Sequence, residues 1–175
     1  MRRLTLSIVF ILILSSSLVA QQAKIEIPQY TDQQRWNRAA SLSNSLNVMN
    51  IAIGKAKGMT IEEIGNWIGR QFAASWSSAM TPQFLFMGFH RNYMTAPTAI
   101  MEITAATEND ITFRMNRYYL QYFGDAGISY GVTVQEFEKV GMLINKAIAE
   151  HGGLQMEQKI DGMWWITTVS KKVGK

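Results

Sequence analysis

The spacing of apolar residues changes its period near residue 100, and this change constrains the fold more than any other feature. Before it, apolar residues recur every three or four positions, as they do in amphipathic helices. After it, residues 100–105 and 111–119 alternate between apolar and polar, as they do in strands with one buried face. The sequence therefore predicts a helical first half followed by antiparallel hairpins.

We expect the first helix to run from Asp32, as its N-cap, to Gly58, where a glycine readily ends a helix. Apolar residues along it stand three and four positions apart, so they share one side. An amphipathic helix packs its apolar side on the core, and we expect these residues to be buried. They are Trp36, Ala39, Leu42, Leu46, Met49 and Ile53.

The second helix carries the clearest start signal. Thr60 and Glu63 have the spacing of a capping box, in which the threonine hydroxyl accepts from the Glu63 N–H and the carboxylate reaches back. The small residues Gly65, Gly69 and Ala73 then form a smooth stripe. Each interior glycine lowers helix stability by about 1 kcal/mol relative to alanine, so we expect close packing of the first or third helix there. A ligand lying in the groove is the functional alternative.

A third helix should open at Thr81-Pro82, since proline at the first helical position loses no hydrogen bond. Apolar residues surround it on all sides, which predicts a largely buried helix. A second capping box, from Thr133 to Glu136, begins a fourth helix that should end at Gly152.

The last hairpin contains Asp161-Gly162, a strong two-residue turn signal. Centring the turn on this dipeptide places Ile160 opposite Met163. One face of each hairpin is then apolar and is expected to face the core. These faces carry Leu154, Met156, Ile160, Met163, Trp165 and Val169 in the last hairpin, and Met101, Ile103, Ile111, Phe113 and Met115 in the first.

Trp164 and Ile166 fall on the opposite, mostly polar face of the last hairpin. The same register places Lys159 opposite Trp164, where the ammonium can lie over the indole in a cation–π contact worth about 0.5–1 kcal/mol. The alternative is that Trp164 and Ile166 contact a partner or a second subunit. Single exposed apolar residues are common on folded proteins, which favours the first interpretation.

The sequence thus predicts an α+β fold with three N-terminal helices followed by ββαββ. Its four strands form a mainly antiparallel sheet, which helices cover on one face. Residues 32–175 would form a single domain, preceded by an extended lead at 21–31. The order of elements resembles that of the ligand-binding α+β domains of the 4-vinyl-reductase and haem-NO-binding type. The resemblance rests on that order, without a shared residue motif, and implies a fold alone.

Residues 1–20 have the pattern of a secretory signal peptide. Arg2 and Arg3 precede a largely apolar run at 4–14, and three serines lead to a small residue, Ala20, at the predicted cleavage point. The apolar run is short against the ~20 residues of a spanning helix, so cleavage is favoured over a retained anchor. We therefore expect a periplasmic or secreted protein.

Composition argues against several functions. The formal net charge of +4 comes from 17 basic and 13 acidic residues, and the basic excess lies at the two ends of the chain. Nucleic-acid binding needs clustered lysines and arginines, and it is not expected. With two histidines, no cysteine and no tight carboxylate cluster, no metal site is expected. No cofactor motif occurs, and no cofactor is expected.

Two residues are candidates for catalysis. Residues 127–131 match G-x-S-x-G, a pattern that presents a nucleophilic serine between a strand and a helix, here Ser129. The downstream His151 lies on the same helix as the acids before it, which favours a plain glycine-rich loop. His90, among aromatic residues of the third helix, could act as a general base. No carboxylate stands at helical spacing to orient it, which favours a core histidine.

Abundant methionines and aromatic residues indicate an adaptable apolar interior. We expect a pocket between the second and third helices and the sheet, in an exported, non-enzymatic domain that binds an apolar small molecule or a protein partner. The alternatives are a small cofactor-independent hydrolase that uses Ser129 or His90, and a structural cell-envelope subunit that uses Trp164 and Ile166. The expected pocket lining is Trp76, Phe86, His90, Tyr93 and Tyr119.

Overall fold

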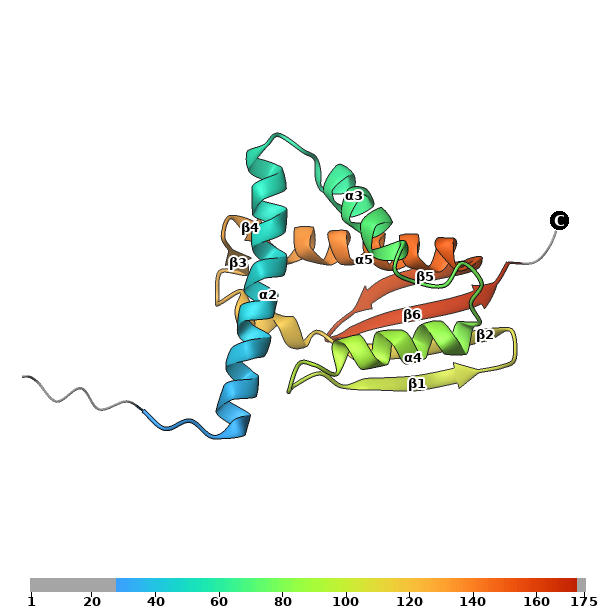
Figure 1. The fold of residues 1–175 in the computed structure, drawn as a ribbon, viewed down its shortest axis with the longest axis horizontal. Helices are drawn as coiled ribbons and strands as arrows, with labels where there is room; N and C mark the ends of the chain where they lie inside the picture. The colour runs from blue at the N-terminus through green and yellow to red at the C-terminus, as the bar shows by residue number, and fades with distance from the viewer. Residues whose placement is uncertain (1–27, 173–175) are drawn as a thin grey trace, which may run out of the picture. The chain divides into compact units, whose positions relative to one another are not determined.

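The structure has the α+β architecture that the change of apolar period predicts. A computed structural model describes residues 28–172 (Figure 1). The expected signal peptide, residues 1–20, and residues 21–27 of the predicted lead lie outside the described residues. Thr31–Lys175 forms one unit of the chain, and residues 28–30, which precede it, have no regular secondary structure.

The described part of this unit contains four α-helices, a four-stranded sheet and a short two-stranded hairpin. The elements are α2 (Asp32–Ala56), α3 (Ile61–Ala73), α4 (Pro82–Tyr93), β1 (Met101–Ala106), β2 (Asp110–Asn116), the 3₁₀ helix η1 (Tyr118–Tyr122), β3 (Ile128–Ser129), β4 (Val132–Thr133), α5 (Val134–His151), β5 (Leu154–Asp161) and β6 (Trp164–Lys171). The sheet order is β1-β2-β6-β5, with every neighbouring pair antiparallel. Figure 1 shows α4 and α5 beside this sheet. Both helices share a buried apolar cluster with its inner face.

The helix starts follow the predicted capping chemistry. Thr60 and Glu63 form the expected capping box of α3, and Thr133 and Glu136 form that of α5. The N-cap of α2 is Thr31 rather than Asp32, because the Thr31 hydroxyl accepts from the N–H three residues ahead and the side chain there caps back. Asp32 instead occupies the first turn, where its negative charge favours the helix dipole.

Helix α2 turns the side opposite to the expected one toward the rest of the unit. All six residues of the predicted apolar stripe are exposed, and Leu46 is 66% exposed. The buried positions are Asn44, Val48, Ile51 and Gly54. The prediction that the stripe packs on the core is therefore wrong.

Among the described residues, no helix has the length and the apolar character that crossing a membrane requires.

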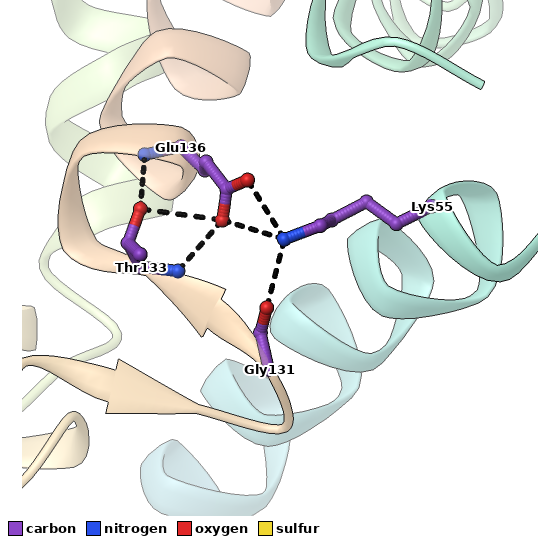
Figure 2. Close-up of polar contacts among 4 residues, drawn as sticks. All are labelled: Lys55, Gly131, Thr133 and Glu136. Carbon is purple, nitrogen blue, oxygen red and sulfur yellow. Dashed lines mark hydrogen bonds and ion pairs between the residues drawn. The ribbon is translucent and has the colours of Figure 1, made fainter. Parts of the chain in front are cut away.

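Contacts near the C-terminal end of α2 fix this rotation. A Cβ on Gly54 would lie 2.7 Å from Ile64 Cδ1, so α2 approaches α3 on its glycine side. The Lys55 ammonium donates to the Gly131 carbonyl at 2.8 Å and to the Glu136 carboxylate at 2.7 and 2.8 Å (Figure 2). Because these contacts come from two adjacent residues, they hold one side of the helix inward and leave the apolar stripe outside.

The small residues of α3 pack against α5. A Cβ on Gly65 would lie 2.6 Å from Leu143 Cδ1, and a Cβ on Gly69 would lie 2.9 Å from Ala147 Cβ. The stripe therefore serves close helix packing, as favoured from the sequence. Its partner is α5, which comes later in the chain than either helix that we expected.

Helix α4 is buried on one side only. Leu85, Phe86 and Phe89 are buried against the sheet, whereas Phe84 and Met87 are exposed. Thr81 caps the helix and Pro82 opens it, as predicted. The expected all-round burial is wrong, because no layer of the described structure covers the outer side of α4.

The last hairpin has the expected faces but a different register. Asp161 pairs with Trp164, so the central turn residues are Gly162 and Met163. Gly162 has a φ of 56° and is the only residue of this turn with a positive φ, which matches a type II′ turn with glycine first. Each residue of β5 therefore pairs with a residue of β6 two positions beyond the predicted partner. A shift of two positions keeps each side chain on the predicted face of the sheet. Trp165 is consequently buried, whereas Met163, expected inside, is exposed in the turn.

The first hairpin also departs from the prediction at two places. Ile103, expected to face the core, is 52% exposed on edge strand β1, beside an irregularity between Ile103 and Ala105. The chain leaves the sheet after Asn116 to form η1, so the strand predicted through Tyr119 is too long. The inward residues of β2 are buried as expected; they are Ile111, Phe113 and Met115.

Candidate functional site

A cavity of about 550 Å³ lies between α2 and the layer formed by α3, α4, α5 and the inner face of the sheet. Cavities that bind drug-sized ligands measure about 300–1,000 Å³, so this one has room for a small molecule. Helix α2 closes one side of it, with Ala40, Ser43, Asn44, Asn47, Asn50 and Ile51.

Aromatic rings and side-chain amides dominate the cavity wall. The aromatic members are Phe72, Trp76, Phe89, Tyr93, Tyr118, Tyr119, Phe137 and Trp165. The asparagines are Asn44, Asn47, Asn50, Asn92 and Asn145. Among the described residues that line the cavity, none has a charged side chain. A charged ligand would gain no countercharge from this wall, so the wall suits an uncharged one.

The amides on α2 reach the cavity because of the unexpected rotation of this helix. Asn44, Asn47 and Asn50 are spaced by three residues and therefore share one side of it. This polar side faces the cavity, while the apolar stripe faces away from it. The sequence pattern alone predicted the opposite orientation and therefore missed these residues.

A tyrosine–amide pair joins α4 to α5 across the cavity wall. The Tyr93 hydroxyl donates to Asn145 Oδ1 at 3.1 Å, and Asn145 is buried. Burial raises the pKa of Tyr93, although its hydrogen bond with Asn145 acts in the opposite direction. The Tyr93 hydroxyl therefore stays protonated and offers a neutral polar group to a ligand.

Trp165 forms part of the cavity wall from β6. Its ring packs edge-on against Tyr119, with the ring centroids 6.1 Å apart, and the Cη2 edge of the ring points at Gly141 of α5. The Trp165 Nε1 atom is buried and has no hydrogen-bond partner within the described structure. A buried donor without a partner is rare in folded proteins, so this atom marks the wall as a place for a polar group of a ligand or a water.

Tyr119 presents its ring to the cavity while its hydroxyl belongs to a buried ion pair. The hydroxyl donates to Glu138 Oε1 at 2.6 Å, and Arg117 Nη2 lies 2.6 Å from the same oxygen. Burial, and then the neighbouring Glu138 carboxylate, raise the pKa of Tyr119 far above its ordinary value. This network holds η1 against α5 and fixes the position of the Tyr119 ring.

Three of the five residues predicted to line a pocket do line this cavity, namely Trp76, Tyr93 and Tyr119. Phe86 and His90 lie outside its wall. Phe86 packs edge-on against Phe113, with 5.1 Å between centroids, and tilts against His90 at 5.9 Å. Phe86 packs against β2, and His90 stands four residues further along α4, on the same side of the helix as Phe86.

The G-x-S-x-G pattern forms a β-hairpin and lacks the geometry of a nucleophile elbow. Ser129 lies in β3 and pairs with Val132, and the turn between them consists of Tyr130 (φ 50°) and Gly131 (φ 72°). Two positive φ values in a two-residue turn define type I′. In the described structure no hydrogen bond joins Ser129 to a histidine, and His151 Nε2 lies instead 3.1 Å from the Trp76 carbonyl. The arrangement does not support Ser129 as a catalytic nucleophile.

On the outer face of the sheet, Trp164 is stacked by Arg114 rather than by Lys159. The Arg114 guanidinium carbon lies 4.2 Å from the Trp164 ring centroid. Lys159 pairs with Ile166 because the register differs by two from the predicted one. The predicted contact of Lys159 with Trp164 is therefore wrong, and Arg114 forms the cation–π contact instead. A partner contact through Trp164 and Ile166 stays a prediction.

No family model matches the chain, and no curated protein does. Two crystal structures of an H-NOX protein from K. algicida have a weak structural likeness to it. The unliganded Fe(II) form of a mutant shows 13% identity and a TM-score of 0.37, covering 89% of this chain and 81% of that one. The unliganded Fe(II) protein without that mutation shows 12% identity and a TM-score of 0.36, covering 86% and 78%. This likeness says nothing about the function of the chain.

The residues of the cavity do not fit an iron site. Haem iron is held by a histidine, a cysteine or a tyrosine phenolate, with methionine as a further ligand. Among the described residues that line the cavity, none is a histidine or a cysteine. Burial raises the pKa of Tyr93, Tyr118 and Tyr119, which disfavours the phenolate form of each. No group of three potential metal ligands occurs elsewhere in residues 28–172.

Proposed function

We propose that the protein binds an uncharged, largely apolar small molecule, without chemical conversion, in the cavity between α2 and the α3–α5–sheet layer. The observation that carries the proposal is a cavity of about 550 Å³ whose described wall has eight aromatic residues and no charged side chain. Burial of apolar ligand surface would drive binding, at roughly 25 cal/mol for each Å² removed from water. The asparagines and Tyr93 would then orient the ligand.

A matched pair of fluorescent probes tests both the apolar character and the absence of charge. N-phenyl-1-naphthylamine is neutral, and 8-anilino-1-naphthalenesulfonate has the same ring system with an added sulfonate. We expect the neutral probe to bind with a stoichiometry of one, and the anionic probe to bind at least about tenfold more weakly, because its charge would be desolvated without a partner. Equal binding of both probes, or binding of neither, would contradict the proposal.

The site of binding is tested by two neighbouring substitutions on α2. Ala40 lines the cavity, whereas Ala39 is exposed and does not. Ala40→Trp would place an indole in the cavity, and we expect it to abolish binding of the neutral probe. Ala39→Trp adds the same side chain on the exposed side and should leave binding unchanged. Equal effects of the two substitutions would place the probe elsewhere.

We also propose that the protein is exported, on the strength of the signal-peptide pattern in residues 1–20. These residues lie outside the described part of the chain. Full-length protein expressed in a Gram-negative host should appear in the periplasmic fraction with Gln21 as its first residue. A full-length mass in the membrane fraction would favour the retained anchor instead.

A further inference from the structure

Two buried polar atoms on the inner face of the sheet have no hydrogen-bond partner, the Trp165 indole Nε1 and Gln158 Oε1. Trp165 is 3% exposed, and an indole N–H can only donate. The amide nitrogen of Gln158 already donates to Thr167 Oγ1 at 3.0 Å, which leaves Oε1 as a free acceptor. A donor and an acceptor are thus buried on adjacent strands without the partners that such groups ordinarily have.

The two residues border the same small void. A second cavity of about 10 Å³ is lined by both Trp165 and Gln158. A void of this size holds about one water-sized group. It shares with the large cavity the wall residues Phe89, Tyr93, Met115, Asn145 and Trp165. The small void therefore adjoins the large cavity across a shared wall, and it has room for one small polar group; we call it the annex.

We propose that the ligand carries a hydroxyl group that enters this annex, accepts a hydrogen bond from Trp165 Nε1–H and donates one to Gln158 Oε1. The inference rests on the proposed function, because it requires a ligand in the large cavity. It adds the chemical class of that ligand, which is an uncharged apolar alcohol or phenol.

The combination of a free donor and a free acceptor selects among polar groups. A ketone or ester oxygen accepts from Trp165 but has no proton for Gln158. A carboxylate has the same deficiency and adds a charge beside a wall that has none. A hydroxyl satisfies both atoms and matches the size of the annex. A resident water would also satisfy both atoms, and it would leave an alcohol with no advantage over a hydrocarbon.

Three compounds with one apolar body separate these cases, namely 4-tert-butylcyclohexanol, 4-tert-butylcyclohexanone and tert-butylcyclohexane. Each is titrated into ¹⁵N-labelled protein, and binding is followed by NMR. We expect the alcohol to bind about tenfold more tightly than the other two, since only it pairs both buried atoms. The indole N–H signal of Trp165, assigned by its loss in Trp165→Phe, should move downfield with the alcohol and far less with the hydrocarbon.

Two substitutions test the partners separately. Trp165→Phe keeps an aromatic ring and removes the donor, and Gln158→Met keeps the length of the side chain and removes the acceptor. Each should reduce the preference for the alcohol over the hydrocarbon to near unity while the hydrocarbon still binds. If Trp165→Phe does not fold, Gln158→Met still tests the hydroxyl site.

The results of these experiments distinguish failure of the hydroxyl site from failure of the proposed function on which it rests. Equal affinities for the three compounds, a preference for the ketone, or an alcohol preference that survives both substitutions would overturn the hydroxyl site and leave the binding cavity intact. If none of the three compounds binds and the neutral fluorescent probe also fails, the binding function itself is wrong.

Discussion

The edge of the Trp165 indole points at Gly141 of α5, and a Cβ at position 141 would stand 2.7 Å from Trp165 Cη2. This contact joins the helix layer to the inner face of the sheet at the wall of the cavity. Contact at this distance is shorter than carbon atoms tolerate. The ring and the glycine therefore fit only as a pair.

Gly141→Ala should destabilise the protein, although alanine ordinarily favours a helix over glycine by about 1 kcal/mol. The added methyl group would displace the indole, and overpacking of this kind lowers the free energy of unfolding by about 1–3 kcal/mol. Urea unfolding followed by tryptophan fluorescence measures the change. Gln135→Ala, an exposed substitution on the same helix, should stay within about 0.5 kcal/mol. A more stable Gly141→Ala protein would contradict the contact.

The ion pair between Lys55 and Glu136 makes stability depend on pH in the acid range (Figure 2). Burial alone would raise the pKa of Glu136, but hydrogen bonds from Lys55 and from the Thr133 backbone outweigh it and hold the pKa below its usual range. Because the folded pKa is lowered, the stabilisation is present above the ordinary glutamate value, about 4.3, and is lost as pH falls through the lowered one.

Lys55→Met should therefore lower the free energy of unfolding by about 1 kcal/mol at neutral pH. The difference from the unsubstituted protein should shrink in acid, as the pH falls through the lowered pKa and Glu136 gains a proton. Thermal unfolding at neutral and at acid pH measures the effect. Lys57→Met, two residues further along and exposed, is the control and should have little effect at either pH. A difference that persists unchanged in acid would show that Lys55 acts through packing alone.

Substitutions on the two sides of α2 should affect the free energy of unfolding in the opposite order to the one that the apolar pattern predicts. Val48 is fully buried and Leu46 is 66% exposed. Val48→Ala should lower the free energy of unfolding by about 1–3 kcal/mol, since it removes buried methyl groups and leaves a cavity. Leu46→Ala, which removes a larger side chain, should change it by less than about 0.5 kcal/mol. If Leu46→Ala proves the more damaging, α2 has the rotation that the sequence pattern predicts.

The β3–β4 turn places a tyrosine in a backbone conformation that favours asparagine or glycine. Tyr130 has a φ of 50° ahead of Gly131 at 72°, and Asn-Gly is the preferred pair for a type I′ turn. The Tyr130 side chain is exposed. Tyr130→Asn should therefore stabilise the protein by about 1 kcal/mol, measured as a rise in the denaturant midpoint. A loss of stability would mean that the ring makes a contact worth more than the strain.

Local signals in the sequence predicted much of the fold. The capping boxes at Thr60 and Thr133 mark where two helices begin, because the cap is made by residues three apart in the chain. The alternation in β5 and β6 predicted that Trp165 is buried with its side chain on the core face. An error of two in the register left this conclusion intact, because strand side chains repeat with a period of two.

The residues of the candidate site that we did not predict could not be found from the pattern of apolar residues in the sequence. Asn44, Gln158 and Thr167 are polar residues on inner faces, and apolar spacing treats such residues as solvent-facing. One signal of this buried polar pair was available in the sequence. The alternation of the two strands places Gln158 and Thr167 on the core side. We assigned Phe86 and His90 to the pocket because the sequence predicted the helix that carries them. It did not show where α2 lies, and therefore did not show which side of that helix borders the cavity.

The amino-acid sequence by itself determined where α3, α4 and α5 begin, which side of β2, β5 and β6 is apolar, and that the class is α+β. Tertiary structure alone decided that asparagines of α2 line the cavity, and that Gln158 of β5 and Trp165 of β6, each with a buried polar atom that has no partner, line one small void. The physical reason is one of range. Caps, turns and strand alternation involve atoms a few residues apart, whereas the rotation of α2 depends on contacts such as Lys55 with Glu136, which lie 81 residues apart.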